Sequence, residues 1–173
     1  MTRTGRRPCA GSPVLRVLAV AGVLAVVPAC TTPTSPAPTA GTVTGTASPV
    51  ALEPAAYAAA LVEGTNAARL AGGLPALEVS ACATQAADRR AADLVGVAEL
   101  THAPLDDVIQ GCDAPRTAEN LSRASAPPAD VVEAWLASPG HRDNLLDPDL
   151  RHVGVACVPD GPALLCSQVL LGP

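Results

Sequence analysis

The scarcity of aromatic side chains constrains the fold of this chain more than any other feature. The 173 residues include one Trp, one Tyr and no Phe, although 49% of them are hydrophobic. Alanine and the branched aliphatic residues must therefore build the core. Because protein interiors are close-packed, a core of such small side chains predicts that neighbouring elements approach with their backbones close together. Trp135 must then fill the largest gap, and we expect it to anchor the core.

The distribution of charge excludes one class of function. All 11 basic residues are arginines, and four of them precede position 30, whereas all 16 acidic residues follow it. A chain shortened by its first 29 residues would carry 16 acidic residues against the remaining seven arginines. A surface with this excess of negative charge repels the phosphate backbone of nucleic acids. We therefore expect no nucleic-acid partner. The lack of lysine also excludes Schiff-base catalysis by a lysine.

The N-terminus has the pattern of an export signal. Residues 1–13 are polar and basic, and an apolar run of 11 residues follows from Val17 to Val27. That run is too short to span a bilayer and has the length typical of a signal-peptide core. We therefore interpret residues 1–29 as a signal peptide.

The segment Val27-Pro28-Ala29-Cys30 resembles a bacterial lipobox, in which cleavage before the cysteine is followed by lipidation of its sulfur. The alternative is ordinary cleavage after Ala29, because Val-x-Ala also suits the general signal peptidase. Cysteine parity favours lipidation. Once Cys9 has left with the signal and Cys30 carries lipid, four cysteines remain, enough for two disulfides in an oxidising compartment.

Residues 30–53 combine the lipidated cysteine with a tether rich in Thr, Pro, Ser and Ala. A segment of this composition cannot bury a core and instead spaces a folded domain from its anchor. The sequence thus predicts a protein held on the outer face of the bacterial cell membrane through the Cys30 lipid. Secretion in soluble form is the alternative.

Residues 54–173 form the predicted folded domain, with helices first and a hairpin last. We expect one helix from Pro54 to Gly72-Gly73, a second capped by Ser80, and a third from Pro127-Pro128 through Trp135. Shorter helical turns are expected near residues 105–110 and 141–146. Strands near residues 151–158 and 163–171, joined by turn residues, complete an α+β domain.

The hairpin also predicts the disulfides. A two-residue turn at Gly161-Pro162 places Cys157 opposite Cys166 and on the same face of the hairpin. The remaining pair is then Cys82–Cys112, which joins the second helix to the segment before Glu119.

Several segments, read in order, resemble the bacterial branch of the CAP superfamily (cysteine-rich secretory proteins, antigen 5, pathogenesis-related 1). This resemblance implies a three-layer α/β/α sandwich around a small antiparallel sheet. The segments are Asn66-Ala67-Ala68-Arg69 with residues 73–77, Leu100-Thr101-His102, Ala118-Glu119-Asn120-Leu121, residues 135–146, Val153-Gly154-Val155 and Ser167-Gln168-Val169.

The family's cleft carries two histidines and two acidic residues, and the resemblance assigns three of them here to His102, Glu119 and His141. The second acid is missing, because Ser138 stands at the position where many eukaryotic relatives have Glu. Glu133 is close in sequence but lies on another side of its helix. Asn66, Arg69, Asn120 and Trp135 are expected to be structural residues of the same motifs.

Two interpretations of the cleft remain open. His102 and His141 could bind Zn²⁺ through neutral ring nitrogens, with Glu119 as a second-shell acceptor or as a general base on a bound water. Alternatively, the three form a polar network that shapes the cleft without metal. Ser138 as a nucleophile is disfavoured, because Ser before Pro-Gly is ordinary turn chemistry, and His152 is expected at the surface.

The function hypotheses follow from these alternatives. The favoured one is a non-enzymatic extracytoplasmic CAP-domain lipoprotein whose cleft binds a lipid, a small ligand or an envelope partner. A metal-assisted hydrolase of peptide or cell-wall material is the first alternative, and a structural envelope module is the second.

Overall fold

The computed structural model describes residues 53–173. The predicted signal peptide, Cys30 and the tether as far as Leu52 lie outside the described residues. Among those described, no helix is both long and apolar enough to cross a membrane.

The described chain has the predicted helices and the predicted C-terminal hairpin, and it adds two strands, β1 and β2, that the sequence did not predict. The elements are α1 (Pro54–Ala71), β1 (Glu78–Val79), α2 (Ala81–Asp93), α3 (Asp106–Cys112), β2 (Arg116–Ala124), α4 (Pro128–Ala137), α5 (Pro139–Leu145), β3 (His152–Asp160) and β4 (Ala163–Gly172).

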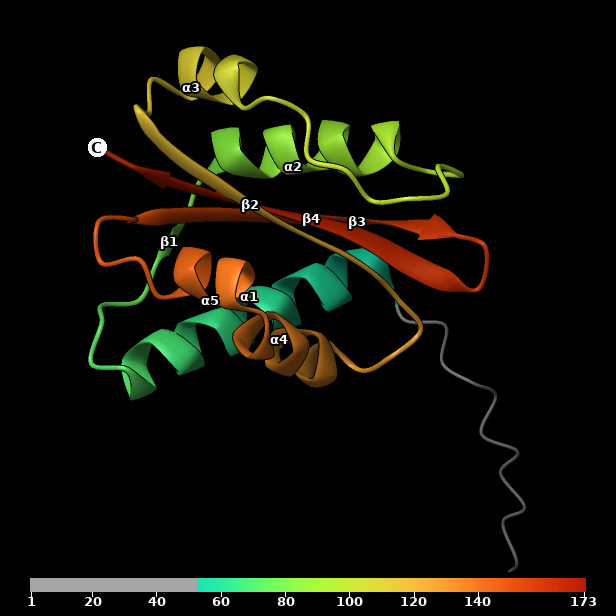
Figure 1. Ribbon diagram of the computed structural model, residues 1–173, viewed down its shortest axis with the longest axis horizontal. Coiled ribbons are helices and arrows are strands. Elements are labelled where there is room, and N and C mark those ends of the chain that lie inside the picture. Colours follow the sequence, from blue (N-terminus) through green and yellow to red (C-terminus); the bar gives the residue numbers. More distant parts are fainter. Residues whose placement is uncertain (1–52) are drawn as a thin grey trace, which may run out of the picture. The chain divides into compact units, whose positions relative to one another are not determined.

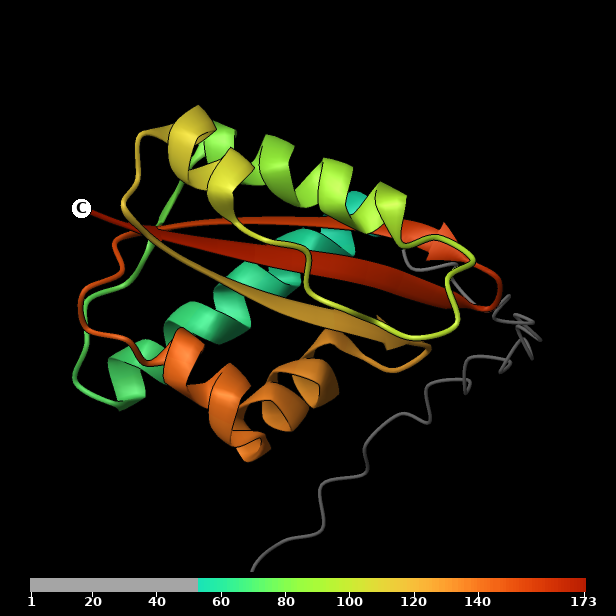
Figure 2. The ribbon, with the colours of Figure 1, turned by 45° about the horizontal axis from the view of Figure 1, so that its top comes forward.

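The sheet has the strand order β1-β3-β4-β2. Helices α2 and α3 cover one face of it, and α1, α4 and α5 cover the other (Figure 1, Figure 2). The predicted α/β/α sandwich is confirmed. The sheet is not wholly antiparallel as predicted, because the two-residue β1 pairs parallel with β3.

The sequence reading missed β2, although β2 holds Glu119. Its sequence, Arg-Thr-Ala-Glu-Asn-Leu-Ser-Arg-Ala, lacks the alternation that marks a half-buried strand. Both faces of β2 are covered by helices, and its buried positions include the polar residues Glu119 and Asn120. The hydrophobic pattern therefore did not indicate a strand, because the buried side chains of Glu119 and Asn120 are polar and form hydrogen bonds.

The close backbone approach expected of an aromatic-poor core occurs where α2 crosses β3. A Cβ atom added to Gly154 would lie 2.0 Å from the backbone nitrogen of Thr84 and 2.2 Å from the carbonyl carbon of Ala83. On this face, α2 contributes a buried stripe that includes Ala83, Ala86 and Ala87. Small residues on both sides thus bring the helix down onto the strand.

Trp135 anchors the larger core on the opposite face, as expected. It is 2% exposed and packs in one cluster with residues of α1, α4, α5, β3 and β4. Its indole nitrogen donates to the carbonyl oxygen of Leu121 at 3.1 Å. This bond satisfies the one polar atom that the buried ring brings into the core.

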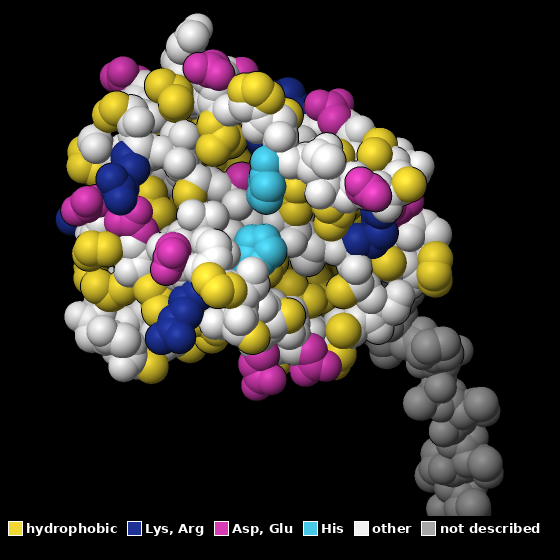
Figure 3. Space-filling model, in the orientation of Figure 1, with side chains coloured by type: hydrophobic (Ala, Val, Ile, Leu, Met, Phe, Trp, Pro, Cys, Tyr) yellow, Lys and Arg dark blue, Asp and Glu magenta, His cyan; other side chains and the backbone are white. Residues whose placement is uncertain are grey.

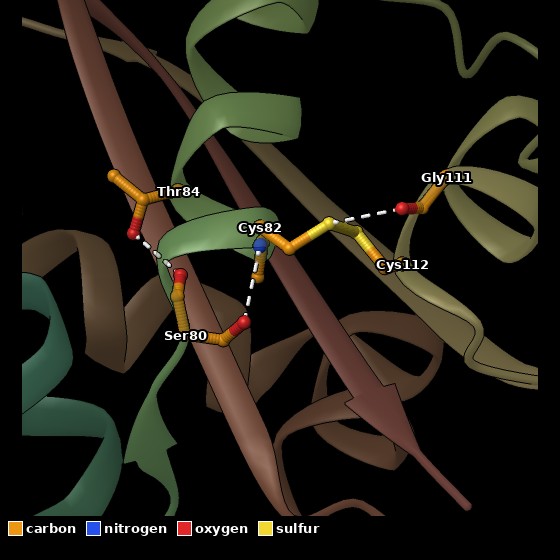
Figure 4. Close-up of a disulfide and its surroundings, with 6 residues drawn as sticks. Ser80, Cys82, Thr84, Gly111 and Cys112 are labelled. Atoms are coloured by element: carbon orange, nitrogen blue, oxygen red, sulfur yellow. Dashed lines mark hydrogen bonds between the residues drawn. A yellow bond between two sulfur atoms is a disulfide. The ribbon is translucent and has the colours of Figure 1, made fainter.

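The start of α2 is fixed by a cap and a disulfide. The Ser80 hydroxyl accepts a hydrogen bond from the Ala83 backbone N–H, and the Thr84 hydroxyl donates to the Ser80 carbonyl (Figure 4). Cys82 is bonded to Cys112 at the end of α3, as predicted. The cap satisfies an otherwise free helical N–H, and the disulfide ties α2 to α3.

The C-terminal hairpin has the predicted register. Asp160 pairs with Ala163 across a two-residue turn, and Cys157 stands opposite Cys166. These two cysteines form the second disulfide, with Cα atoms 4.1 Å apart.

Arg69 and Asn66 both bind backbone groups of distant segments. Arg69 is fully buried, and its guanidinium donates to the carbonyl oxygens of Pro75, Leu145, Asp147 and Leu150 at 2.9–3.2 Å. Asn66 exchanges two hydrogen bonds with the backbone of Leu77. Through these bonds α1 organises the irregular segments that lead into β1 and β3.

Candidate functional site

The site is built around Glu119 in the middle of β2. The residue is 5% exposed, and its carboxylate accepts four hydrogen bonds. Arg90 of α2 forms a bidentate pair with it, from Nε to Oε1 at 2.6 Å and from Nη2 to Oε2 at 3.1 Å. The Ser167 hydroxyl donates to Oε1 at 2.9 Å, and His102 Nδ1 lies 2.8 Å from Oε2. A buried carboxylate is thus fully paired.

Its surroundings keep Glu119 ionised. Burial alone would raise the pKa of Glu119. The hydrogen bonds from Arg90 and His102, the positive charge of Arg90 and the bond from Ser167 more than offset it, so the pKa is below its usual value. Protonation of Glu119 would therefore weaken these hydrogen bonds.

His102 lies on the segment between α2 and α3, and its side chain is 52% exposed. Because Glu119 is an ionised acceptor, the hydrogen bond requires the proton on Nδ1 of His102. In the neutral ring Nε2 is then the free acceptor. The buried carboxylate therefore sets both the orientation and the tautomer of an accessible imidazole.

His141 is the third residue of α5 and is half-buried. Burial lowers the pKa of His141, and the neighbouring charge of His102 lowers it further. The ring is therefore neutral at pH 7. Figure 3 shows two histidine side chains next to each other on one face of the domain. Two imidazoles that reach the surface from different elements can contact a common ligand.

Side-chain amides behind the histidines link the layers. Asn144 of α5 donates to Asn120 Oδ1 at 2.9 Å, Asn120 donates to Gln168 Oε1 at 2.9 Å, and Gln168 donates to the Thr65 hydroxyl at 2.9 Å. Asn120 Nδ2 also donates to the His141 carbonyl oxygen at 3.4 Å. This chain fixes α5, and with it His141, against the sheet.

A pocket of about 300 Å³ adjoins the buried carboxylate. Thr101 and Ala103, the two neighbours of His102 in the chain, form part of its wall. The other lining residues are Arg89, Arg90, Asp93, Leu94, Pro104, Asp107 and Glu119. The site therefore offers a hollow of small-molecule size beside an oriented imidazole.

Comparison with known proteins now identifies the fold. Residues 62–169 match the CAP family, described as the cysteine-rich secretory protein family. The chain belongs to the CAP family. It is also 31% identical to the uncharacterized protein YkwD of Bacillus subtilis (strain 168) over 134 residues, which are 73% of this chain and 52% of YkwD. The chain thus spans about half the length of this relative.

Solved structures show the same CAP fold. An extracellular protein containing a SCP domain from Bacillus anthracis (strain Ames) superposes with a TM-score of 0.62 at 20% identity, over 69% of this chain and 41% of that one. A cysteine-rich secretory protein from Staphylococcus aureus (strain Mu50) gives 0.62 at 22% identity, over 72% and 40%. An outer surface protein of Borrelia burgdorferi gives 0.57 at 24% identity, over 65% and 88%.

Within this CAP domain the sequence reading missed Arg90 and Ser167, the partners that hold Glu119. The sequence does contain a pattern that indicates the buried position of Arg90. It continues the buried alanine stripe of α2, in which Ala83, Ala86, Ala87, Arg90 and Ala91 follow helical spacing. A lone charge in such a stripe implies a buried counter-charge. Ser167 carried no comparable signal.

The remaining candidates from the sequence are Ser138, Glu133 and His152. Ser138 joins α4 to α5, and its backbone carbonyl accepts from the Arg142 N–H at 2.8 Å, as expected of a turn residue. Glu133 is exposed on α4, and His152 is exposed at the start of β3.

The metal hypothesis can be compared with the donor set of the CAP domain. Across residues 53–173, no group of three or more His, Cys, Asp or Glu side chains is arranged to hold a metal ion. His102 and His141 are two donors, and Glu119 already binds Arg90. A Zn²⁺ ion held by these two histidines would have no third protein ligand among the described residues, and Glu119 would stand behind His102.

Proposed function

We propose that this CAP domain is a non-enzymatic binding module that acts outside the cytoplasm and takes a small ligand or an envelope partner at His102 and His141. The observation that carries the proposal is the complete pairing of Glu119. All four of its hydrogen bonds go to protein groups, and Arg90 occupies both of its oxygens. Its role is to hold His102, which makes Glu119 a positioning residue.

This pairing argues against general-base catalysis by Glu119. A general base must reach the proton that it removes and must bind it with a pKa near the working pH. Glu119 is 5% exposed, and its pKa is depressed. The histidines are the more accessible groups, and two imidazoles that reach the surface suit recognition by hydrogen bonding.

A ligand can be described by the chemistry that these groups recognise. The imidazole rings offer ring nitrogens for hydrogen bonding, and the pocket wall adds Thr101, Asp93, Asp107 and apolar surface from Leu94 and Pro104. Such a mixture fits a small molecule with both hydroxyl groups and an apolar part. It also fits a polar segment of an envelope component.

The second candidate is a metal-assisted hydrolase. The His102–Glu119 pair favours it, because a histidine that binds a metal usually donates its other N–H to a carboxylate. His102 and His141 would hold Zn²⁺, which when bound supplies a Lewis acid. Calorimetric titration with Zn²⁺ should then show one site that His102→Ala and His141→Ala each remove and that the exposed His152→Ala leaves intact. A third candidate, a purely structural envelope module, predicts binding of neither metal nor ligand.

The location outside the cytoplasm is supported by the signal pattern at residues 1–29 and by two disulfides, since such bonds persist in oxidising compartments. We extend the proposal to a lipid on Cys30. Mass spectrometry of the protein from its own membrane should find an acylated Cys30 at the N-terminus. A mature chain that begins at an unmodified residue would refute the anchor.

The binding proposal is tested on the protein purified from its native envelope. Extracted small molecules are identified by mass spectrometry and metals by elemental analysis, in parallel for the wild type, His102→Ala, His141→Ala and the matched control His152→Ala. We expect a molecule retained by the wild type and the control and lost from the other two. Equal contents in all four would contradict a ligand site at these histidines.

A further inference from the structure

A second hollow, separate from the histidine site, lies along the outer edge of the sheet. It is about 660 Å³ in volume, and α1, α2, β1 and β3 all contribute to its wall. We call it the edge groove. Its lining residues include Ala59, Glu63, Val79, Asp88, Val155 and Cys157. Helices α1 and α2 lie on opposite faces of the sheet, so the groove runs between them (Figure 2).

The floor of the edge groove is a strand with a free edge. Strand β1 pairs with β3 only at His152 and Val153, and the Ser80 N–H donates to the Val153 carbonyl. In a strand the N–H and C=O of alternate residues point to the same side. Val155 and Cys157 therefore direct their backbone groups away from β4, and no described strand pairs with β3 on this outer side at these two residues.

The walls of the groove select the side chains that can enter. Most of the surface is formed by alanine, valine and proline, which leaves room for small apolar side chains. The charged lining residues are Glu63 and Asp88, both exposed, and no basic residue is among the described residues that line it. Two carboxylates beside an apolar floor attract a positively charged partner.

From these observations we propose that the edge groove binds an extended, basic peptide segment of a partner protein, which adds a strand to β3 beside Val155 and Cys157. Backbone hydrogen bonds to the free edge give affinity, and small side chains fit between α1 and α2. Basic residues of the peptide pair with Glu63 and Asp88. Strand addition of this kind needs about four to six residues, at about 3.3 Å each.

A second copy of the chain suits the groove less well. The edge of β3 is recessed between two helices, so two such edges cannot meet without displacing α1 or α2. Each copy would also bring Glu63 and Asp88 to the same interface, and like charges held together there would oppose association.

The test uses a designed peptide, Ac-Lys-Val-Thr-Ala-Val-Lys-NH2, and amide hydrogen exchange of the ¹⁵N-labelled protein measured by NMR. With saturating peptide, the amides of Val155 and Cys157 should exchange at least tenfold more slowly. A version of the peptide with methylated backbone nitrogens should give no protection, because the methyl groups remove its donors and keep its carbonyl oxygens from approaching the strand. A version of the peptide with Glu in place of Lys should bind at least tenfold more weakly. The protein double variant Glu63→Gln, Asp88→Asn should bind the Lys and Glu peptides equally well.

Matched variants locate the peptide. Ala59 and Ala56 are both exposed on α1, but only Ala59 lines the groove. Ala59→Trp should weaken binding more than tenfold and Ala56→Trp should not. Equal binding by the two variants would overturn the proposal. So would amides of Val155 and Cys157 that are already protected without peptide, which would mean occupation by a second copy in a dimer or by the chain's own N-terminal segment in a monomer.

Discussion

Arg90 and Glu119 form a buried bidentate ion pair between α2 and β2, with Nε 2.6 Å from Oε1 and Nη2 3.1 Å from Oε2. Neither residue is more than 8% exposed. Arg90 also donates to the carbonyl oxygens of Ala103 and Pro104, so the same guanidinium supports the segment that carries His102. The pair therefore fixes both the carboxylate and the histidine that it orients.

Glu119→Gln should lower the free energy of unfolding at pH 7 by about 3 kcal/mol, because it removes the buried counter-charge of Arg90 and leaves only the exposed Asp107, 3.6 Å away. Urea denaturation measures the loss. Glu133→Gln removes an exposed carboxylate from α4 and serves as the control, with no comparable effect. A Glu119→Gln protein as stable as the wild type would show that the ion pair does not hold this region.

The same residue predicts a pH dependence. The folded pKa of Glu119 is below the ordinary value of about 4.3, so the folded protein binds this proton less tightly than the unfolded chain does. The carboxylate therefore stabilises the fold above about pH 4.3, and the contribution is lost as the pH falls through the folded pKa. The difference in stability between the wild type and Glu119→Gln should shrink between pH 7 and pH 3. A constant difference would contradict this linkage.

Gly154→Ala should be among the most damaging small substitutions in the domain. Its Cβ would overlap the backbone of Ala83 and Thr84, which cannot move without lifting α2 from the sheet. We expect a loss of about 3 kcal/mol or a failure to fold. Gly111→Ala is the control, because a Cβ there meets nothing within 4 Å and alanine favours the helix α3. Equal thermal midpoints for the two variants would contradict the close packing.

Arg69→Met should lower the free energy of unfolding by at least about 3 kcal/mol, because four buried or partly buried carbonyl groups lose their donor. Arg69→Lys should recover only part of the loss, since an ammonium group cannot reach four carbonyls arranged around a planar guanidinium. Urea denaturation of both variants tests this. Full recovery by lysine would mean that charge alone, and not the geometry of the guanidinium, matters at this position.

The parts of the fold that follow local rules could be predicted from the sequence. Pro54, Ser80 and Pro128 mark helix starts, and the two residues Gly161-Pro162 set the hairpin register that pairs Cys157 with Cys166. Strand β2 could not be predicted, because its buried polar residues are compensated by partners that are distant in sequence. Asn120 of β2, for example, bonds Gln168 across 48 positions.

The candidate site shows the same division. Motif resemblance selected His102, Glu119 and His141, and the structure places the first two in direct contact. The partners that decide what Glu119 can do, Arg90 and Ser167, come from α2 and β4. Only the fold brings them together, and for that reason the sequence left a general base and a positioning residue equally open.

The most direct test of the account is the protonation of the His102 ring, measured at pH 8 by long-range ¹H–¹⁵N NMR of the imidazole. If Glu119 holds His102 for binding, the proton resides on Nδ1 in the wild type, and Glu119→Ala shifts the ring toward a mixture of the two tautomers. His141 and His152 serve as internal references. A wild-type ring with Nδ1 unprotonated would mean that His102 does not donate to Glu119, and it would contradict the assignment of Glu119 as a positioning residue.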